Sequence, residues 1–345
     1  MVSTGLKLKF RTDLEKSVLT TNFERRGWTR AASEDEWNVY WALPWTVKSK
    51  IFNPDSGFRL SDNQILNHFP NSDELCKKDL MVKNIKRYRK DLERENSPLA
   101  EKDELGRYVN MDIIPQTYIF PGDYNIFVEE FRRQPNATWI MKPSHRAQGQ
   151  GIFLVTKLTQ LKRWQNESKV PFSNNQGYKE SYVCSKYLEE PLLVGGRKFD
   201  LRIYVLVTSF RPLKVYLYDL GFARFCVEKY SNNTNERENM FIHLTNVAIA
   251  KQNAQYNDKH GGKWTIQNLK FYLEQTQGKG AAEKCFDEIN NIIWVSLKAV
   301  QGVVINDKHC FEMYGFDVLI DANLKPWLIE VNASPSLSTT TEIDR

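Results

Sequence analysis

The sequence predicts a mixed α/β (α+β) fold, in which largely antiparallel sheets carry packed helices, together with a small N-terminal module. The length of 345 residues exceeds what one hydrophobic core usually serves, so two or three subdomains are expected. Short runs rich in β-branched and aromatic residues become dense from Thr138 onward. Two amphipathic helical patterns interrupt these runs, and this order favours helices packed against a sheet.

The N-terminal part predicts a small mixed module of about seventy residues that is rich in tryptophan. Ser61 and Gln64 have the spacing of a capping box, which predicts a short helix over "NQILNHF". The stretch from Lys77 to Arg94 carries eight Lys or Arg against three acids, and its apolar residues recur at helical spacing. This predicted helix is either a scaffold with a solvated basic face or a contact for an anionic partner.

The rest of the chain is expected to form strands, with helices between them. A polar stretch, "ENSPLAEKDELGRYVNMD", predicts a surface loop, and "FPGDYNIFVEEFRR" predicts a helix for which Asp123 is a candidate N-cap. The expected strands are "TWIMKP", "GIFLV", "SYVCSKYL", "FDLRIYVLV", "KVYLYDLGFARF", "FDVLI" and "PWLIEVN". The expected helices among them are "TIQNLKFYLEQT" and "AAEKCFDEINNIIWVSLKAVQ".

The charge balance narrows the class of partner. A net charge of +6 indicates an acidic partner, which is a nucleic acid, an anionic membrane or an acidic peptide. No run of eighteen apolar residues occurs, and the first residues lack the apolar core of a signal peptide, so we expect neither membrane insertion nor secretion. The five cysteines are scattered without a CxxC pair, which is typical of reduced thiols in a cytosolic protein.

Acidic and amide side chains stand beside two very apolar strands near the carboxyl end. Asp317 lies in "FDVLI", and Glu330 and Asn332 lie two apart in "LIEVN", hence on one strand face. A hairpin about the turn "DANLKP" brings the three side chains together. Buried carboxylates need a cation, and oxygen ligands without His or Cys favour Mg²⁺ over Zn²⁺. The alternative is a set of solvated acids at exposed strand ends.

Basic residues at other strand ends predict a polyphosphate site. Lys142 ends "TWIMK" and precedes a loop with Gly149 and Gly151 at GxG spacing, where backbone N–H groups can approach phosphate oxygens. This loop is neither a Walker A motif nor a Rossmann fingerprint. The alternating residues Lys198, Asp200 and Arg202 share one strand face, while Phe199 and Leu201 take the other. Arg224 adds a cation from another strand, and a structural salt-bridge network is the alternative.

Ordered motifs along nearly the whole chain then resemble those of the tubulin tyrosine ligase-like family of ATP-grasp amino-acid ligases. They are "MVKNIKRYRK", "WIMKP", "GQGIFL", "KYLEEPLL", "GGRKFDLRIYVLV", "GFARF", "HLTNVAI", "HGGKWT", "FDVLI" and "LIEVNASPS". These motifs are most similar to those of the polyglutamylase branch, first its member-one type and then its member-nine type. The resemblance implies an ATP-grasp fold with a nucleotide between two subdomains. Its parts are an N-terminal module (1–82), a central subdomain (83–187) and a C-terminal catalytic subdomain (188–345) with a truncated end.

The resemblance also implies roles for residues at matching positions. Ser185 to Leu188 match the linker that holds adenine, and the implied nucleotide contacts as a whole are Lys83, Lys142, Gln148, Gly149, Ser185, Lys186, Tyr187, Leu188, Lys198, Phe199, Asp200, Thr245 and Asn246. Arg202 and Arg224 match catalytic residues that face the γ-phosphate and the incoming amino acid. Lys263 and Gln148, with Arg224, match its binding residues. Asp317, Glu330 and Asn332 match the ligands of two Mg²⁺ ions. One departure is Gln150, where many relatives carry Lys or Arg. The histidines His243 and His309 are interpreted as structural.

In function, the resemblance implies ATP-dependent ligation of glutamate to glutamate side chains of acidic tubulin tails through an acylphosphate. The alternatives are ligation of glycine or tyrosine, and a non-catalytic microtubule-binding module. Implied partners are microtubules, free L-glutamate and accessory subunits, with no nucleic acid and no membrane insertion. The implied location is the cytoplasm and cytoskeleton, including the axoneme or basal body of the cilium.

Overall fold

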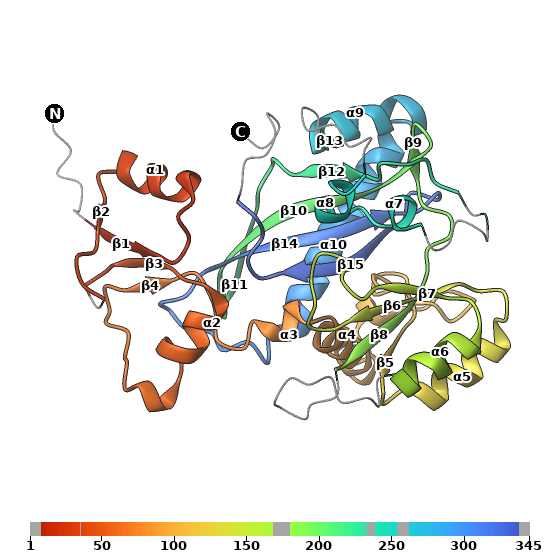
Figure 1. The fold of residues 1–345 in the computed structure, drawn as a ribbon, viewed down its shortest axis with the longest axis horizontal. Coiled ribbons are helices and arrows are strands. Elements are labelled where there is room, and N and C mark those ends of the chain that lie inside the picture. Colours follow the sequence, from red (N-terminus) through yellow and green to blue (C-terminus); the bar gives the residue numbers. More distant parts are fainter. Residues whose placement is uncertain are drawn as a thin grey trace.

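The described part of the chain contains three β-sheets, as a computed structural model shows (Figure 1). The structure describes residues 8–34, 36–167, 180–231, 233, 239–253 and 262–337. Within these ranges, none of the helices combines the length and the hydropathy that a membrane span needs. Figure 1 shows the N-terminal module at the left and the central sheet below the large C-terminal sheet at the right.

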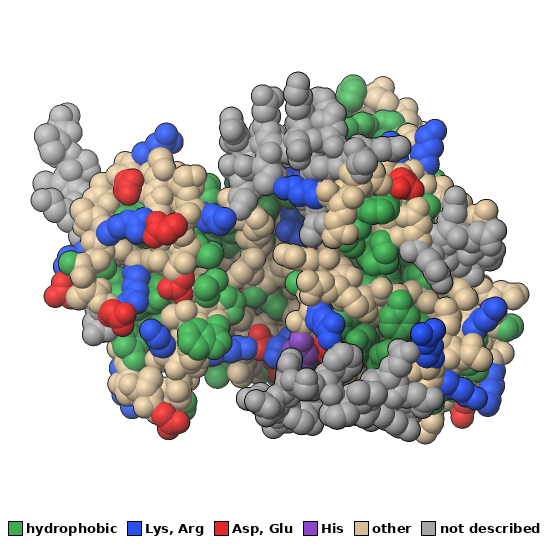
Figure 2. All heavy atoms as spheres, in the orientation of Figure 1, with side chains coloured by type: hydrophobic (Ala, Val, Ile, Leu, Met, Phe, Trp, Pro, Cys, Tyr) green, Lys and Arg blue, Asp and Glu red, His purple; other side chains and the backbone are tan. Residues whose placement is uncertain are grey.

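The N-terminal sheet is parallel, unlike the other two. Its strands follow the order β2-β1-β3-β4 and are β1 (Lys9–Thr12), β2 (Thr29–Arg30), β3 (Val39–Trp41) and β4 (Ile65–Leu66). Its helical elements are α1 (Ser17–Arg25), α2 (Pro44–Thr46), a π-helical turn (Val47–Ile51) and a 3₁₀ turn (Pro54–Ser56). On the face shown in Figure 2, basic and acidic side chains of this module lie next to one another. The exposed ion pairs of the module include Lys9–Glu36 and Arg30–Glu15.

The helix predicted over "NQILNHF" is wrong. This segment contains β4 instead, with Ile65 opposite Val39 and Leu66 bridged to Cys310. Gln64 Oε1 does accept a hydrogen bond from the backbone N–H of Ser61 at 3.0 Å, but no helix follows it. Tertiary contacts override the local signal, because the buried Leu66 pairs with Tyr40 of β3 on one side and forms a bridge with Cys310 on the other.

The central sheet is antiparallel and has the strand order β5-β8-β6-β7. Its strands are β5 (Thr117–Phe120), β6 (Trp139–Pro143), β7 (Phe153–Val155) and β8 (Tyr182–Lys186). The helices α5 (Tyr124–Arg133) and α6 (Leu158–Glu167) accompany it. The predicted helix α5 is confirmed, although the Asp123 side chain accepts from the backbone N–H of Ile119 rather than from the helix.

The large sheet carries the densest strand pairing and is also antiparallel. Its order is β13-β12-β10-β14-β15, and β9 and β11 pair with β10 as well. The strands are β9 (Leu193–Val194), β10 (Arg197–Phe210), β11 (Leu213–Leu217), β12 (Phe222–Phe225), β13 (Lys263–Thr265), β14 (Glu312–Ile320) and β15 (Pro326–Asn332). The helices of this part are α7 (Met240–His243), α8 (Val247–Ala250), α9 (Ile266–Gln277) and α10 (Lys279–Val300). The strands predicted over "FDLRIYVLV", "FDVLI" and "PWLIEVN" and both predicted helices are confirmed. The run "KVYLYDLGFARF", predicted as one strand, forms two strands, β11 and β12.

One large apolar core joins this sheet to α10 and to α4 (Lys78–Arg94), which follows the short helix α3 (Asp73–Cys76). A 3₁₀ turn (Pro98–Ala100) comes after α4. The predicted helix α4 is confirmed, and it buries Met81, Val82, Ile85 and Leu92. Its exposed side presents Lys83, Arg87, Lys90 and Arg94 at helical spacing. The predicted boundary between residues 82 and 83 lies within this helix, and the division into three subdomains stays a prediction.

Candidate active site

A cleft lies between the central sheet and the large sheet, and the first turns of α4 form part of its wall. It is lined by charged side chains and by apolar ones. The charged residues are Lys78, Lys142, Arg146, Lys186, Lys198, Asp200, Asp317 and Glu330; the apolar ones include Met81, Val82, Ile114, Ile140, Val183 and Leu328. Such a mixed lining suits a ligand that combines an apolar ring with a charged tail.

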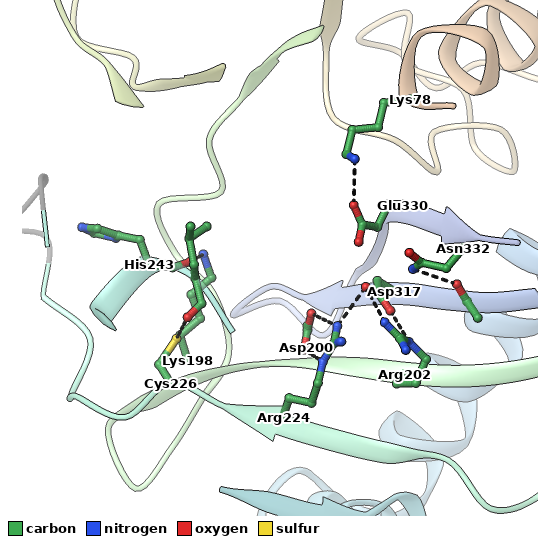
Figure 3. A network of polar contacts seen from close by, with 12 residues as sticks. Lys78, Lys198, Asp200, Arg202, Arg224, Cys226, His243, Asp317, Glu330 and Asn332 are labelled. Atoms are coloured by element: carbon green, nitrogen blue, oxygen red, sulfur yellow. Dashed lines mark hydrogen bonds and ion pairs between the residues drawn. The ribbon is translucent and has the colours of Figure 1, made fainter. Parts of the chain in front are cut away.

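The hairpin of β14 and β15 presents the predicted oxygen ligands. Asp317 lies opposite Glu330, and Gly315 lies opposite Asn332, with the register shifting just after Asp317. Because alternate residues of a strand share a face, the register brings Asp317, Glu330 and Asn332 onto one face of the sheet (Figure 3). The amide of Asn332 donates to the backbone carbonyl of Gly315 at 3.3 Å.

The donor set of this hairpin consists of two carboxylates and one amide. Among the residues that the structure describes, no group of three or more His, Cys, Asp and Glu side chains is placed to hold a metal. Mg²⁺ is usually bound by one or two carboxylates together with waters and phosphate oxygens, rather than by a cage of protein ligands. The hairpin therefore fits Mg²⁺ that is held jointly by the protein and a polyphosphate.

Two arginines contact Asp317, which is only 2% exposed. Arg202 Nε lies 2.6 Å from Asp317 Oδ1, and Arg224 Nη2 lies 2.9 Å from Oδ2. Although burial acts in the opposite direction, the guanidinium groups of Arg224 and Arg202 hold the pKa of Asp317 well below its usual value. Asp200 pairs with Arg224 through both carboxylate oxygens, at 2.8 and 2.5 Å. Figure 3 shows this chain of charges crossing the strands.

Four lysines line the cleft, and each comes from a different helix or strand. Lys78, in the first turn of α4, lies 3.1 Å from Glu330, and Lys198 donates to the Tyr187 hydroxyl and to the carbonyl of His243, each at 3.1 Å. Burial lowers the pKa of Lys198, and burial lowers the pKa of Lys142 to about 8, an effect that Glu330 partly opposes. Ammonium groups placed in this way offer positive charge to an anion.

The segment from Ser185 to Leu188 forms another part of the lining. It continues β8, with the backbone N–H of Lys186 donating to Gln116 and that of Tyr187 donating to Thr138. The Ser185 hydroxyl lies 2.8 Å from that of Thr117. The segment is therefore held at both neighbouring strands, next to the apolar part of the cleft.

The loop between β6 and β7 approaches the cleft with unusual backbone angles. Gln148 and Gly149 have φ of +60° and +79°, and both line the cleft with Thr245 and Asn246. A Cβ at Gly149 would lie 2.5 Å from Cδ1 of Ile249, so a side chain here would require that methyl group to move and would also be strained at a φ of +79°. Backbone N–H groups of such a loop can contact phosphate oxygens.

Two predicted nucleotide contacts lie away from the cleft. Lys83 is exposed on the opposite side of α4, because the packing of Met81 and Val82 turns the Lys78 side of the helix toward the cleft. Phe199 is buried in the large core and its ring contacts that of Phe225. The alternation of β10 accounts for this position, since Phe199 shares its face with Leu201 rather than with Lys198 and Asp200.

Lys263 lies beside the cleft rather than in its lining. It is opposite Arg224 in the pairing of β12 with β13, and its ammonium lies 4.7 Å from the centre of the Phe222 ring. Arg202 and Arg224 are likewise behind the lining residues, in contact with Asp317. The structure thus brings these three cations to the same side of the sheet.

The sequence analysis does not predict three ionisable residues of the cleft lining: Lys78, Arg146 and His243. Lys78 belongs to the predicted basic helix, but the resemblance implies a contact for Lys83 of the same helix. Arg146 pairs with Glu180 through two contacts of 2.8 Å. His243 makes the kind of contact expected of a structural histidine, because its Nδ1 lies 2.8 Å from the Tyr187 hydroxyl, and it also lines the cleft.

Comparisons with known proteins agree on one family. The profile of the tubulin-tyrosine ligase family matches residues 58–345. The chain is 61% identical over 341 residues to the probable alpha-tubulin polyglutamylase Ttll1 of Tetrahymena thermophila, covering 98% of this chain and 82% of that protein. It is 41% identical to the probable tubulin polyglutamylase TTLL9 of Rattus norvegicus, covering 98% and 76%. It is 35% identical to the human tubulin polyglutamylase TTLL5, covering 83% and 21%.

Proposed function

The chain belongs to the tubulin-tyrosine ligase family, and from this premise we propose that it is a tubulin polyglutamylase, an ATP-dependent ligase that joins glutamate to glutamate side chains of tubulin tails. Its two antiparallel sheets with a cleft between them are the ATP-grasp fold of that family. The observation that carries the proposal is the 61% identity, over 98% of the chain, to a probable alpha-tubulin polyglutamylase. The cleft supports it, because its charges suit a nucleotide polyphosphate.

The proposed reaction needs no side-chain nucleophile. The γ-carboxylate of an acceptor glutamate attacks the γ-phosphate of ATP, which gives an acylphosphate and ADP, and the amine of free glutamate then displaces phosphate. Lys78, Lys142 and Lys198 offset the negative charge of the phosphates, while the segment from Ser185 to Leu188 holds the adenine. Mg²⁺ bound by Asp317, Glu330 and Asn332 would supply further neutralisation and orientation of the polyphosphate.

We assign to Arg224 and Lys263, the cations beside the cleft, the selection of the amino acid that is ligated. Arg224 and Lys263 lie opposite each other on β12 and β13, each only 7% exposed, and two cations so close together can attract a second carboxylate on the incoming amino acid. This favours glutamate over glycine and tyrosine. Arg202, adjacent to Asp317, is assigned to the transferred phosphoryl group.

The partners and location follow from this activity. Acidic tubulin tails and microtubules suit the net charge of +6, and the exposed basic side of α4 gives them an anion-attracting surface. Cytoskeletal location follows from a tubulin substrate. Accessory subunits and a place at the ciliary axoneme or basal body are further parts of the proposal.

Incubation of the protein with Mg-ATP and a tubulin tail peptide, with glutamate, glycine or tyrosine supplied separately, tests the proposal by mass spectrometry. Addition of glutamate alone is expected, and Glu330→Gln should remove it. Addition of glycine without glutamate would overturn the amino-acid assignment. A melting temperature unchanged by saturating Mg-ATP would favour a non-catalytic microtubule-binding module, since a ligand bound only by the native state stabilises it.

A further inference from the structure

Four buried charges form one continuous chain beneath the cleft. Arg224 contacts both oxygens of Asp200 and, through Nη2, Asp317 Oδ2 at 2.9 Å. Asp317 also accepts from Arg202, from Nε at 2.6 Å and from Nη2 at 3.1 Å. The exposed fractions of Asp200, Arg202, Arg224 and Asp317 are 6%, 9%, 7% and 2%. Two carboxylates and two guanidinium groups thus balance one another away from solvent.

The chain of charges places the arginines in competition with a cation. Both oxygens of Asp317 accept hydrogen bonds from guanidinium groups, so a divalent cation that binds this carboxylate must replace those contacts. A buried ion that loses its partner is strongly destabilised unless another group compensates it. Arg224 would keep Asp200 as its partner. Among the described residues, Arg202 has no second carboxylate contact, so it would require an anion from outside.

Gly315 on β14 leaves room for the side chain of Arg202. A Cβ at Gly315 would lie 3.2 Å from Cδ and 3.3 Å from Nε of Arg202, and 2.9 Å from Cβ of Pro335. The absence of a side chain at Gly315 therefore lets the arginine lie flat across β14 to reach Asp317. Figure 3 shows the two arginines approaching Asp317 from neighbouring strands.

We propose that Arg202 and Arg224 compete with the divalent cation for Asp317, and that Asp200 is the positioning residue that keeps Arg224 in the site when the cation takes that carboxylate. The proposal deepens the proposed function and rests on it for the identity of the anions. Nucleotide phosphates attract Arg202 away from Asp317, so the cation and the nucleotide raise each other's affinity by the same factor. Asp200 holds Arg224 where its remaining N–H donors face the incoming amino acid.

Binding of Mn²⁺, followed by the paramagnetic resonance signal of the free ion, tests the competition without any turnover. Without nucleotide, Arg202→Gln should bind Mn²⁺ at least about tenfold more tightly than the wild type, because one competitor is gone. Arg146→Gln is the matched control, since it also removes one positive charge from the cleft but pairs with Glu180 instead of Asp317. Equal Mn²⁺ affinity of the two variants overturns the competition, and so does unchanged Mn²⁺ binding by Asp317→Asn.

A second variant covers the case in which Arg202→Gln does not fold. Arg224→Gln removes the other contact to Asp317 and should also tighten Mn²⁺ binding relative to Arg146→Gln. Adding an unreactive ATP analogue should tighten Mn²⁺ binding of the wild type more than that of either arginine variant. If the ATP analogue tightens Mn²⁺ binding by the same factor in the wild type and in the arginine variants, the arginines do not couple the cation to the nucleotide. These binding results hold or fail whichever amino acid the protein ligates, so they separate this inference from the proposed function.

The role of Asp200 is tested by separate kinetic constants. Asp200→Asn should raise the KM for glutamate about tenfold or more while leaving the KM for ATP within about twofold, because the change acts through Arg224. Asp200→Glu, which keeps the charge, should restore part of the lost affinity for glutamate. A raised KM for ATP with an unchanged KM for glutamate would instead make Asp200 a direct nucleotide contact and overturn its positioning role.

Discussion

Lys78 and Glu330 form an ion pair of 3.1 Å that links the first turn of α4 to β15. The Lys78 ammonium also donates to the backbone carbonyl of Arg146 at 3.2 Å, so one side chain joins the helix, the acidic hairpin and the loop between β6 and β7. The side chains of the pair are 11% and 23% exposed. A pair so placed can exchange partners with an anion and a cation that enter the cleft together.

Neutralising Lys78 should therefore weaken nucleotide binding. Lys78→Met removes a positive charge from the cleft, and we expect the Kd for Mg-ATP to rise about tenfold or more. Lys83→Met removes the same charge from the exposed side of the same helix and is the control. Calorimetric titration of both variants measures the difference. Equal weakening by the two changes would show that only the overall charge of α4 matters.

The pKa of Lys142 predicts a pH dependence of nucleotide affinity. Burial lowers this pKa to about 8, so the side chain is an ammonium near pH 7 and loses its proton as the pH rises past 8. A phosphate favours the ammonium form, so the Kd for ATP should rise above pH 8, approaching tenfold per pH unit. Lys142→Arg keeps its charge and should bind with little pH dependence between pH 7 and 9.5. If the Kd for ATP rises with pH equally in the wild type and in Lys142→Arg, the pH dependence does not come from the Lys142 ammonium.

The period-two pattern of the strands made much of the site predictable. Lys198, Asp200 and Arg202 share a face because they alternate, and the hairpin of β14 and β15 follows from two apolar runs around a turn. The strand order was not predictable from local patterns. It places β12 and β14 on either side of β10, and only this order brings Arg224 to Asp317.

The choice between Lys78 and Lys83 shows a second limit. Both lie on one helix, five residues apart, and therefore point in directions about 140° apart. Which direction faces the cleft depends on how Met81 and Val82 pack, a tertiary contact that the helix pattern does not encode. The helix prediction over "NQILNHF" is wrong for a related reason. Pairing of this segment with β3 and Cys310 outweighs the helix signal of its capping box.

Removing the carboxylate of Glu312, far from the cleft, should lower the free energy of unfolding strongly. The side chain has no exposed surface and accepts from the backbone N–H of Phe69 at 3.0 Å and from the Tyr314 hydroxyl at 2.9 Å, while its other oxygen lies 2.8 Å from His68 Nδ1. Glu312→Ala leaves two buried donors without a partner, at a cost of about 1–3 kcal/mol each. Chemical denaturation should therefore show a loss of several kcal/mol.

The matched control for Glu312→Ala is Lys308→Ala, which breaks an exposed ion pair with Asp62. Exposed pairs contribute little, so this variant should unfold at nearly the wild-type denaturant concentration. A Glu312→Ala protein as stable as Lys308→Ala would show that the segment around His68 is not held to β14 by this carboxylate.

A side chain at Gly149 should clash with Ile249, and a smaller side chain at position 249 should relieve the clash. Gly149→Ala places a Cβ 2.5 Å from Cδ1 of Ile249, in addition to the strain of a side chain at φ of +79°. Gly106→Ala has a similar φ of +73° with no heavy atom within 4 Å, so it isolates the backbone strain of about 1–2 kcal/mol. We expect Gly149→Ala to lower the melting temperature more than Gly106→Ala and to weaken ATP binding. Ile249→Val deletes the clashing Cδ1 but also removes a buried methyl group, so it serves as the reference for the double variant. Gly149→Ala should cost less stability in the Ile249→Val background than in the wild type. An equal cost in the two backgrounds would contradict the contact between the loop and Ile249.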